Sequence, residues 1–235
     1  MIQQEFVDTV ATAAMNYNEA VQTAAASAVE ELSVWDLTLR GGWIMIPLAL
    51  LSIISIYIFV ERYLVIRRAQ KEDNSFMDRI REYILDGEIE NARHLCAKTD
   101  TPYARLIGKG ISRIGRPMND VLVTIENTGN IEVTALEKGL PWLATTAAGG
   151  PMIGFLGTVI GMVQAFYNLA SAGSSANIAV LADGIYSALV TTVAGLIVGI
   201  IAMFAYNFLV ARITKVMNAL EAKTMEFMDL LNEPA

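Results

Sequence analysis

Three long stretches without Asp, Glu, Lys or Arg constrain this chain more than any other feature of its sequence. They lie between Arg40 and Glu61, between Lys138 and Asp183, and between Asp183 and Arg212. A membrane-spanning helix needs roughly 20 mostly apolar residues, so each stretch can hold one span, and the second also has room for a turn. Only 17% of the 235 residues are charged, against about 25% in soluble domains. We therefore predict three spans with modest soluble parts.

The distribution of charge predicts how the spans are oriented. Basic residues follow the first uncharged stretch, whereas acidic residues dominate before it. Because cytoplasmic loops carry an excess of Lys and Arg, we place the N-terminus outside the cytoplasm and residue 62 onward inside it. Arg212 and Lys215 follow the third stretch and place the C-terminus in the cytoplasm. Three spans satisfy both ends.

The segments between the spans are expected to be helical. Residues 1–39 are predicted to form an extracytoplasmic amphipathic helix along the membrane, with a loosely ordered tail as the alternative. Residues 62–140 have apolar positions at helical period and are expected to form a cytoplasmic helical domain, whose last helix begins after Asn119 or Asp120 and runs toward the second span. The prediction is an all-α membrane protein with spans at 40–61, 141–170 and 178–211, a periplasmic turn at 171–177 and a cytoplasmic helix at 212–235.

Small residues recur every three or four positions along the second and third spans. In lipid, helices associate through close packing of small residues and through hydrogen bonds, because there is no hydrophobic gain from their contact. The pattern predicts that these two spans pack closely, within one chain or between copies. The candidate packing residues are Gly154, Gly157, Gly161, Gly184, Ala188, Gly195 and Gly199.

Hydroxyl side chains accompany both of these ridges. Thr158 lies on the second span, and Ser187, Thr191 and Thr192 lie on the third. A single threonine in a membrane helix commonly bonds to a carbonyl of its own helix, so packing alone is one explanation. Together, the four are candidates for lining an ion pathway. Asp183, near the outer end, either gathers cations at the mouth or caps the third span.

The pathway would lack an acid of its own. Apart from Asp183, the second and third spans contain no acidic or basic residue. A path that moves protons needs a titratable group, and such groups are rare and functional inside membranes. The sequence therefore predicts either no ion path or a partner that supplies the carboxylate.

Charged residues on the predicted cytoplasmic side are candidates for contacts outside the chain. We expect the basic group after the first span to meet anionic lipid. The glutamates before the second span are expected to form salt bridges between copies or to bind a partner's cytoplasmic tail. These contact residues are Arg62, Arg67, Arg68, Glu126, Glu132 and Glu137.

Several function classes are disfavoured by the sequence. The net charge of −7 argues against nucleic acid, which needs a concentrated basic footprint. His94 and Cys96 are too few for a metal site, which needs three or four suitably spaced ligands. The sequence has no Walker A phosphate loop and no nucleophile with a base and an orienting acid. We predict no enzymatic activity, no cofactor and no metal.

Two segments resemble the MotA/TolQ/ExbB proton-channel family, and most of all its ExbB branch. They are LEKGLPWLATTAAGGPMIGFLGTVIGMVQAF at 136–166 and LADGIYSALVTTVAGLIVGIIAMFAYNFL at 181–209. The patterns GxxGTVxGM and GIxxALxTTxxGL carry the resemblance, which extends over about residues 38–232. It implies a homopentamer in the bacterial inner membrane, surrounding two copies of a single-span ExbD-like protein that carries an intramembrane aspartate. Ion flow would then drive a TonB-like protein that reaches outer-membrane receptors.

The resemblance also assigns roles to individual residues. Thr158 falls on the threonine of the family's GTV motif and Thr192 on the threonine of the third span, so both would face the pore near the partner's aspartate. Ser187 departs from the pattern, because many relatives have glutamate there. The departure leaves the choice between H⁺ and Na⁺ open. A TolQ-like role, a gliding or secretion motor and a non-conducting scaffold are the alternatives.

Overall fold

The protein is an elongated bundle of helices in the computed structural model, which describes residues 41–70, 75–172 and 178–232. All regular elements in these ranges are helical, which confirms the all-α prediction. The predicted helix at 1–39, Lys71 and residues 173–177 of the predicted turn lie outside the described residues. The elements are the 3-10 helix η1 (Gly42–Ile44), α3 (Met45–Ala69), α4 (Phe76–Leu85), α5 (Ile89–Lys98), α6 (Pro102–Ile111), α7 (Met118–Glu137), α8 (Leu140–Ser171) and α9 (Ile178–Asn232).

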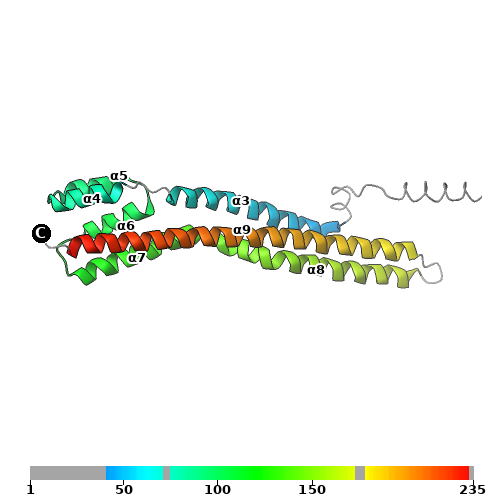
Figure 1. Ribbon diagram of the computed structural model, residues 1–235. Helices are drawn as coiled ribbons and strands as arrows, with labels where there is room; N and C mark the ends of the chain where they lie inside the picture. The colour runs from blue at the N-terminus through cyan, green and yellow to red at the C-terminus, as the bar shows by residue number, and fades with distance from the viewer. Residues whose placement is uncertain (1–40, 71–74, 173–177, 233–235) are drawn as a thin grey trace, which may run out of the picture.

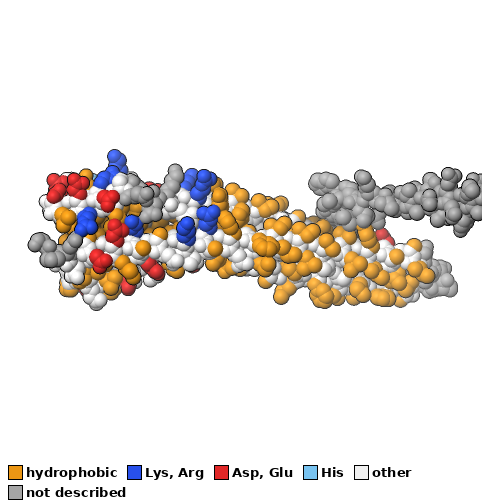
Figure 2. Space-filling model, in the orientation of Figure 1, with side chains coloured by type: hydrophobic (Ala, Val, Ile, Leu, Met, Phe, Trp, Pro, Cys, Tyr) orange, Lys and Arg blue, Asp and Glu red, His pale blue; other side chains and the backbone are white. Residues whose placement is uncertain are grey.

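One half of the molecule consists of α3, α8 and the first part of α9, all three of which are long and apolar. α3, α8 and α9 lie side by side there, while the short helices gather at the opposite end (Figure 1). Each of the three is long and apolar enough to cross a membrane, and among the described residues these three helices agree with the three predicted spans. Hydrophobic side chains cover this half, and Lys and Arg side chains mark where it ends (Figure 2). Such a surface suits lipid, since large exposed apolar patches are rare on soluble monomers.

α9 joins the membrane half of the molecule to the other half without interruption. Its 55 residues span about 83 Å at 1.5 Å per residue. The predicted third span and residues 212–232 of the predicted cytoplasmic helix are therefore one continuous helix, while residues 233–235 lie outside the described residues. Near the end of α9, Phe227 is fully buried against Gly110 of α6, where an added Cβ would lie 2.7 Å from the phenyl ring. The absence of a side chain at Gly110 thus lets α9 dock on the short helices.

The short helices enclose an apolar core at their end of the molecule. Phe76 and Tyr103 meet edge to face with ring centroids 5.2 Å apart, and Ile80, Ile107 and Ile125 are completely buried around them. These residues belong to α4, α6 and α7, which are short and amphipathic, so each buries one face against the others. The core thus fixes the position of α7 relative to the foot of α9.

A sharp elbow separates α7 from α8, where the sequence predicted one helix running toward the second span. α7 ends at Glu137 and Gly139 adopts φ +89°, a left-handed conformation that favours glycine. The start of α7 also differs from the prediction, because Pro117 occupies the N-cap position and no side chain caps the helix. A Cβ added at Gly139 would lie 3.3 Å from Ile58 Cγ2 of α3, so the elbow is pressed against the first span.

Replacing Gly139 with alanine is expected to destabilise the protein more than replacing Gly115. Both glycines have positive φ, and a left-handed backbone costs about 1–2 kcal/mol for other residues. Only Gly139 adds a tight contact, because nothing lies within 4 Å of a Cβ at Gly115. Thermal unfolding of the two variants in detergent measures the difference. Equal losses would show that Ile58 does not constrain the elbow.

Candidate functional site

The site forms where α8 and α9 approach closely enough for their backbones to touch. A Cβ added at Gly195 would lie 2.5 Å from the Gly150 carbonyl oxygen and 2.8 Å from Gly154 Cα, and one at Gly154 would lie 2.8 Å from the Thr191 carbonyl oxygen. We call this contact the glycine seam. The close approach occurs within one chain. The other predicted packing residues lie in it too: Gly157 against Thr191, Gly161 against Ala188, Gly184 against Ala165, and Gly199 against Pro151.

Thr158 of α8 and Thr192 of α9 are hydrogen-bonded to each other across the seam. Both are half-buried, so they stand at the edge of the contact rather than deep inside it. Thr158 Oγ1 also lies 3.2 Å from the Ala188 carbonyl oxygen and 3.3 Å from that of Gly154. Thr192 Oγ1 lies 3.1 Å from the Gly154 carbonyl oxygen. The Gly154 carbonyl, which the sequence analysis did not single out, is thus an acceptor for both helices.

The two hydroxyl groups can share their protons in more than one way. Each hydroxyl has one proton to donate and two lone pairs to accept with. Thr192 can donate to Thr158 while Thr158 donates to the Ala188 carbonyl, or Thr158 can donate to Thr192 while Thr192 donates to the Gly154 carbonyl. In either arrangement a lone pair remains. The pair is therefore a neutral group that can accept a hydrogen bond or offer oxygen to a cation.

The remaining predicted pathway residues occupy different positions. Thr191 is 2% exposed, and its hydroxyl donates to the Ala188 carbonyl oxygen at 2.7 Å. It fills the space beside Gly157 and lies inside the seam rather than at its edge, so we assign its side chain to packing. Ser187 is half-buried and Asp183 is exposed, and both make polar interactions.

Charged groups lie far from the hydroxyl pair along both helices. α8 contains no Asp, Glu, Lys, Arg or His, and α9 has only Asp183 before Arg212. At 1.5 Å per residue, Thr192 lies about 14 Å from Asp183 and about 30 Å from Arg212 along the helix axis. The pair is thus set in an uncharged environment, nearer the end of α9 that carries Asp183.

Arg62 and Glu132 make contacts inside the chain rather than outside it. The Arg62 side chain is 9% exposed and donates to the Ala135 carbonyl oxygen at 3.1 Å and to Glu61 at 2.6 Å. It therefore binds the C-terminal end of α7, where a cation is favourable, and cannot face lipid in this arrangement. Glu132 accepts two hydrogen bonds from Arg105, each 2.7 Å long, and this pairing raises the pKa of Arg105.

The other predicted contact residues remain on the surface. Arg67, Arg68, Glu126 and Glu137 are all exposed. Burial raises the pKa of Cys96 to about 11, so its thiol stays protonated at neutral pH. Among the described residues, no group of three or more His, Cys, Asp or Glu side chains is arranged to hold a metal ion.

Comparison with known proteins assigns a family to the part of the chain that contains the glycine seam and the paired threonines. Residues 98–222 match the MotA/TolQ/ExbB proton channel family, and this range includes the whole seam from Gly150 to Gly199. The chain belongs to that family. The family is one of membrane proton channels, not of enzymes, and the identification agrees with the resemblance found in the sequence.

Relatives of this MotA/TolQ/ExbB-family protein carry the names of two branches. A putative biopolymer transport protein, ExbB-like 1 of Synechocystis sp., is 33% identical over 75% of this chain and 70% of its own length. The biopolymer transport protein ExbB of Neisseria meningitidis is 31% identical over 71% and 80%. The Tol-Pal system protein TolQ of Haemophilus influenzae is 31% identical over 85% and 92%.

Proposed function

We propose that this chain is the channel-forming subunit of an ion-driven motor in the bacterial inner membrane, which energises TonB-dependent transport across the outer membrane. The observation that carries the proposal is the hydrogen-bonded pair of Thr158 and Thr192, set in helices whose one acid before Arg212 is Asp183, about 14 Å from Thr192 along the helix axis. Such a pair can form hydrogen bonds with a charged group or offer oxygen to a cation, but it carries no charge of its own. A single-span ExbD-like partner would bring the missing aspartate.

The energy that an ion releases in crossing the membrane is comparable to the energy needed to hold a charged aspartate at the bilayer centre. Ion flow can therefore drive a cycle in which the partner's aspartate is alternately charged and neutral. One elementary charge crossing 100 mV releases about 2.3 kcal/mol, and a charged Asp at the bilayer centre costs roughly 2.5–3.5 kcal/mol on insertion scales. Protonation or a bound cation would remove most of that cost. One threonine would donate to the charged carboxylate in place of a backbone carbonyl, and a threonine lone pair would accept a hydrogen bond from the protonated carboxyl group. Alternation between the two forms would bias the partner's movement.

The proposed assembly is a homopentamer around two copies of the ExbD-like protein, with the N-terminus periplasmic and the C-terminus cytoplasmic. Exposed Glu126 and Glu137 would contact neighbouring copies or the partner's cytoplasmic tail. Arg67 and Arg68 lie in the last turn of α3, where they would meet anionic headgroups on the cytoplasmic side. A TonB-like protein would carry the motion to the outer membrane.

A TolQ-like role in envelope integrity is the second candidate. It is favoured by the relative from Haemophilus influenzae, whose similarity covers 92% of its own length, more than the 80% covered in the ExbB protein of Neisseria meningitidis. The seam and the hydroxyl pair suit both roles, since each needs a channel-forming subunit. The two roles differ in which protein the motor drives.

Copurification with an ExbD-like single-span protein of the same organism tests the proposal. We expect the two proteins to purify together and to conduct ions in liposomes only when the partner's aspartate is present, with Asp→Asn in the partner as the control. Repeating the assay with and without Na⁺ identifies the ion.

Deletion of this gene should stop energised uptake but leave the envelope intact. A leaky envelope with normal uptake would favour the TolQ-like role. Ion flow in the absence of any partner would refute the proposal that the partner supplies the aspartate.

A further inference from the structure

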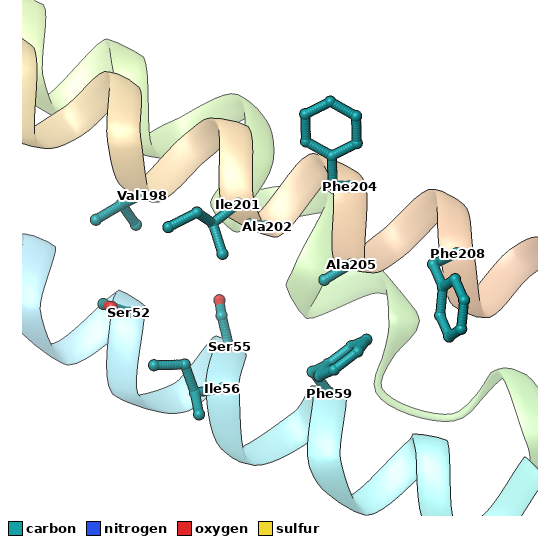
Figure 3. A pocket seen from close by; sticks show the side chains of 10 residues that line it. All are labelled: Ser52, Ser55, Ile56, Phe59, Val198, Ile201, Ala202, Phe204, Ala205 and Phe208. Atoms are coloured by element: carbon teal, nitrogen blue, oxygen red, sulfur yellow. The ribbon is translucent and has the colours of Figure 1, made fainter. Parts of the chain in front are cut away.

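A groove of about 460 Å³ lies between α3 and α9 in the membrane half of the molecule (Figure 3). Small side chains create it, because Ser52 and Ser55 of α3 face Ala202 and Ala205 of α9. Two aromatic side chains, Phe59 and Phe208, stand at the end that leads toward the basic residues. None of the described residues that line the groove is charged.

The groove has the length of one leaflet of a bilayer. Its lining on α9 extends from Val198 to Phe208, which is about 15 Å at 1.5 Å per residue. This is half of the roughly 30 Å hydrocarbon core of a membrane. The groove ends one helical turn before Arg212, the first basic residue of α9. In the predicted orientation it therefore lies at the depth of the inner leaflet.

The interior of the groove suits an apolar occupant. Ser55 is 7% exposed, and its hydroxyl has no hydrogen-bond partner within the part of the chain that the structure describes. A serine in a membrane helix can satisfy its hydroxyl on the carbonyl four residues earlier, so this group does not demand a polar ligand. What Ser55 contributes is its small volume.

The side chain of Arg212 is held at the end of the groove that Phe208 marks, which we call its mouth. The Arg212 guanidinium carbon lies 5.2 Å from the centroid of the Phe208 ring, and its Nη1 donates to Gln70 Oε1 at 3.0 Å. The Gln70 amide in turn donates to the Arg212 carbonyl oxygen at 3.3 Å. The Phe208 ring, which lines the groove, and the side chain of Gln70, the C-cap residue of α3, thus fix the guanidinium. Glu61 is an acid on the same stretch of α3, but it is paired with Arg62. It therefore does not neutralise Arg212, and this end of the groove stays positive.

We propose that this groove binds one acyl chain of an anionic phospholipid of the inner leaflet, whose phosphate is held by Arg212. The guanidinium presents a planar fork of donors that matches phosphate oxygens. The groove supplies apolar contact along one leaflet, and the cation sits where the headgroup begins. This site differs from the diffuse attraction expected for Arg67 and Arg68, because it fixes one lipid between two helices. It requires that α3 and α9 lie in the membrane in the predicted orientation, with Arg212 on the cytoplasmic side, and is independent of the motor's role.

Native mass spectrometry of the full chain in detergent, with added phosphatidylglycerol or phosphatidylcholine of the same acyl chains, tests the site. Wild-type protein is expected to retain phosphatidylglycerol preferentially. Arg212→Gln should lower that preference about fivefold, the value of one basic residue near a charged lipid surface. Ala205→Leu, which fills the groove, should lower retention of both lipids. Arg116→Gln, an exposed cation remote from the groove, and Ala49→Leu, an exposed small residue of α3 outside it, are the matched controls.

Two results would overturn the site. An unchanged preference in Arg212→Gln would show that the headgroup is not held there. If Ala205→Leu instead altered the number of chains per assembly and left lipid retention at the wild-type level, the groove would hold a helix of a second copy. Circular dichroism of each variant checks that the helices remain folded, so that loss of lipid cannot be attributed to unfolding.

Discussion

Replacing Thr158 or Thr192 with valine is expected to abolish energised uptake while the protein still folds and binds its partner. Valine keeps the branched shape of threonine but removes the hydroxyl. Each change deletes one member of the pair that hydrogen-bonds across the seam, so the carboxylate of the partner would meet a single hydroxyl beside a methyl group. Uptake assays in a strain that lacks the chromosomal gene, with copurification of the partner, measure both properties.

The structure explains why these variants should still assemble. After Thr158→Val, Thr192 can still donate to the Gly154 carbonyl at 3.1 Å, and after Thr192→Val, Thr158 can still donate to the Ala188 carbonyl at 3.2 Å. No donor is left buried without an acceptor. Side-chain hydrogen bonds in membrane proteins contribute only about 0.6 kcal/mol each on average. The expected loss of function therefore far exceeds the loss of stability.

Two further variants separate the chemistry of the pair from its packing. Thr158→Ser and Thr192→Ser retain the hydroxyl and should retain much of the uptake. Thr145→Val removes a hydroxyl that bonds only to its own helix, donating to the Pro141 carbonyl at 2.8 Å, and should have no effect. If the valine variants at 158 and 192 energise uptake normally, the protein is a non-conducting scaffold.

Features that depend on local composition could be predicted from the sequence. The three spans follow from uncharged stretches, since a span needs only length and apolarity. The seam follows from the spacing of small residues, because positions three or four apart share a helix face. The sequence also places Thr158 and Thr192 on these two ridges, but it does not predict that their hydroxyl groups bond to each other.

Features that depend on contacts between distant residues could not be predicted in the same way. Arg62 was placed at a lipid surface because it follows a span, yet it binds Ala135, 73 positions later. The sequence predicts that Glu132 contacts a neighbouring copy or a partner's cytoplasmic tail, whereas in the structure it pairs with Arg105. The Arg62 contact lies beside the elbow at Gly139, and the Glu132 contact joins α7 to α6, neither of which the helical pattern of α7 reveals. Charge and periodicity show that a residue needs a partner, but not which one the fold brings to it.

Replacing Gly195 with alanine is expected to remove stability and function together. The new methyl group would lie 2.5 Å from the Gly150 carbonyl oxygen and 2.8 Å from Gly154 Cα, so backbone rather than a flexible side chain would have to move. Overpacking of a well-packed interior costs about 1–3 kcal/mol and occasionally more, and a rigid backbone neighbour places this site at the upper end. Thermal unfolding in detergent should register the loss.

The consequence for the hydroxyl pair makes this variant informative about mechanism. α8 can relieve the clash only by moving away from α9, and that movement separates Thr158 from Thr192. Gly149→Ala is the matched control, because a Cβ there meets nothing within 4 Å of the described residues and should leave the protein as stable as before or more stable by up to about 1 kcal/mol, since alanine is the better helix former. Normal uptake by a stable Gly195→Ala protein would mean that the helices need not touch. Loss of both properties there, beside loss of uptake alone in the valine variants, would show that the seam positions the threonines and that the threonines handle the charge.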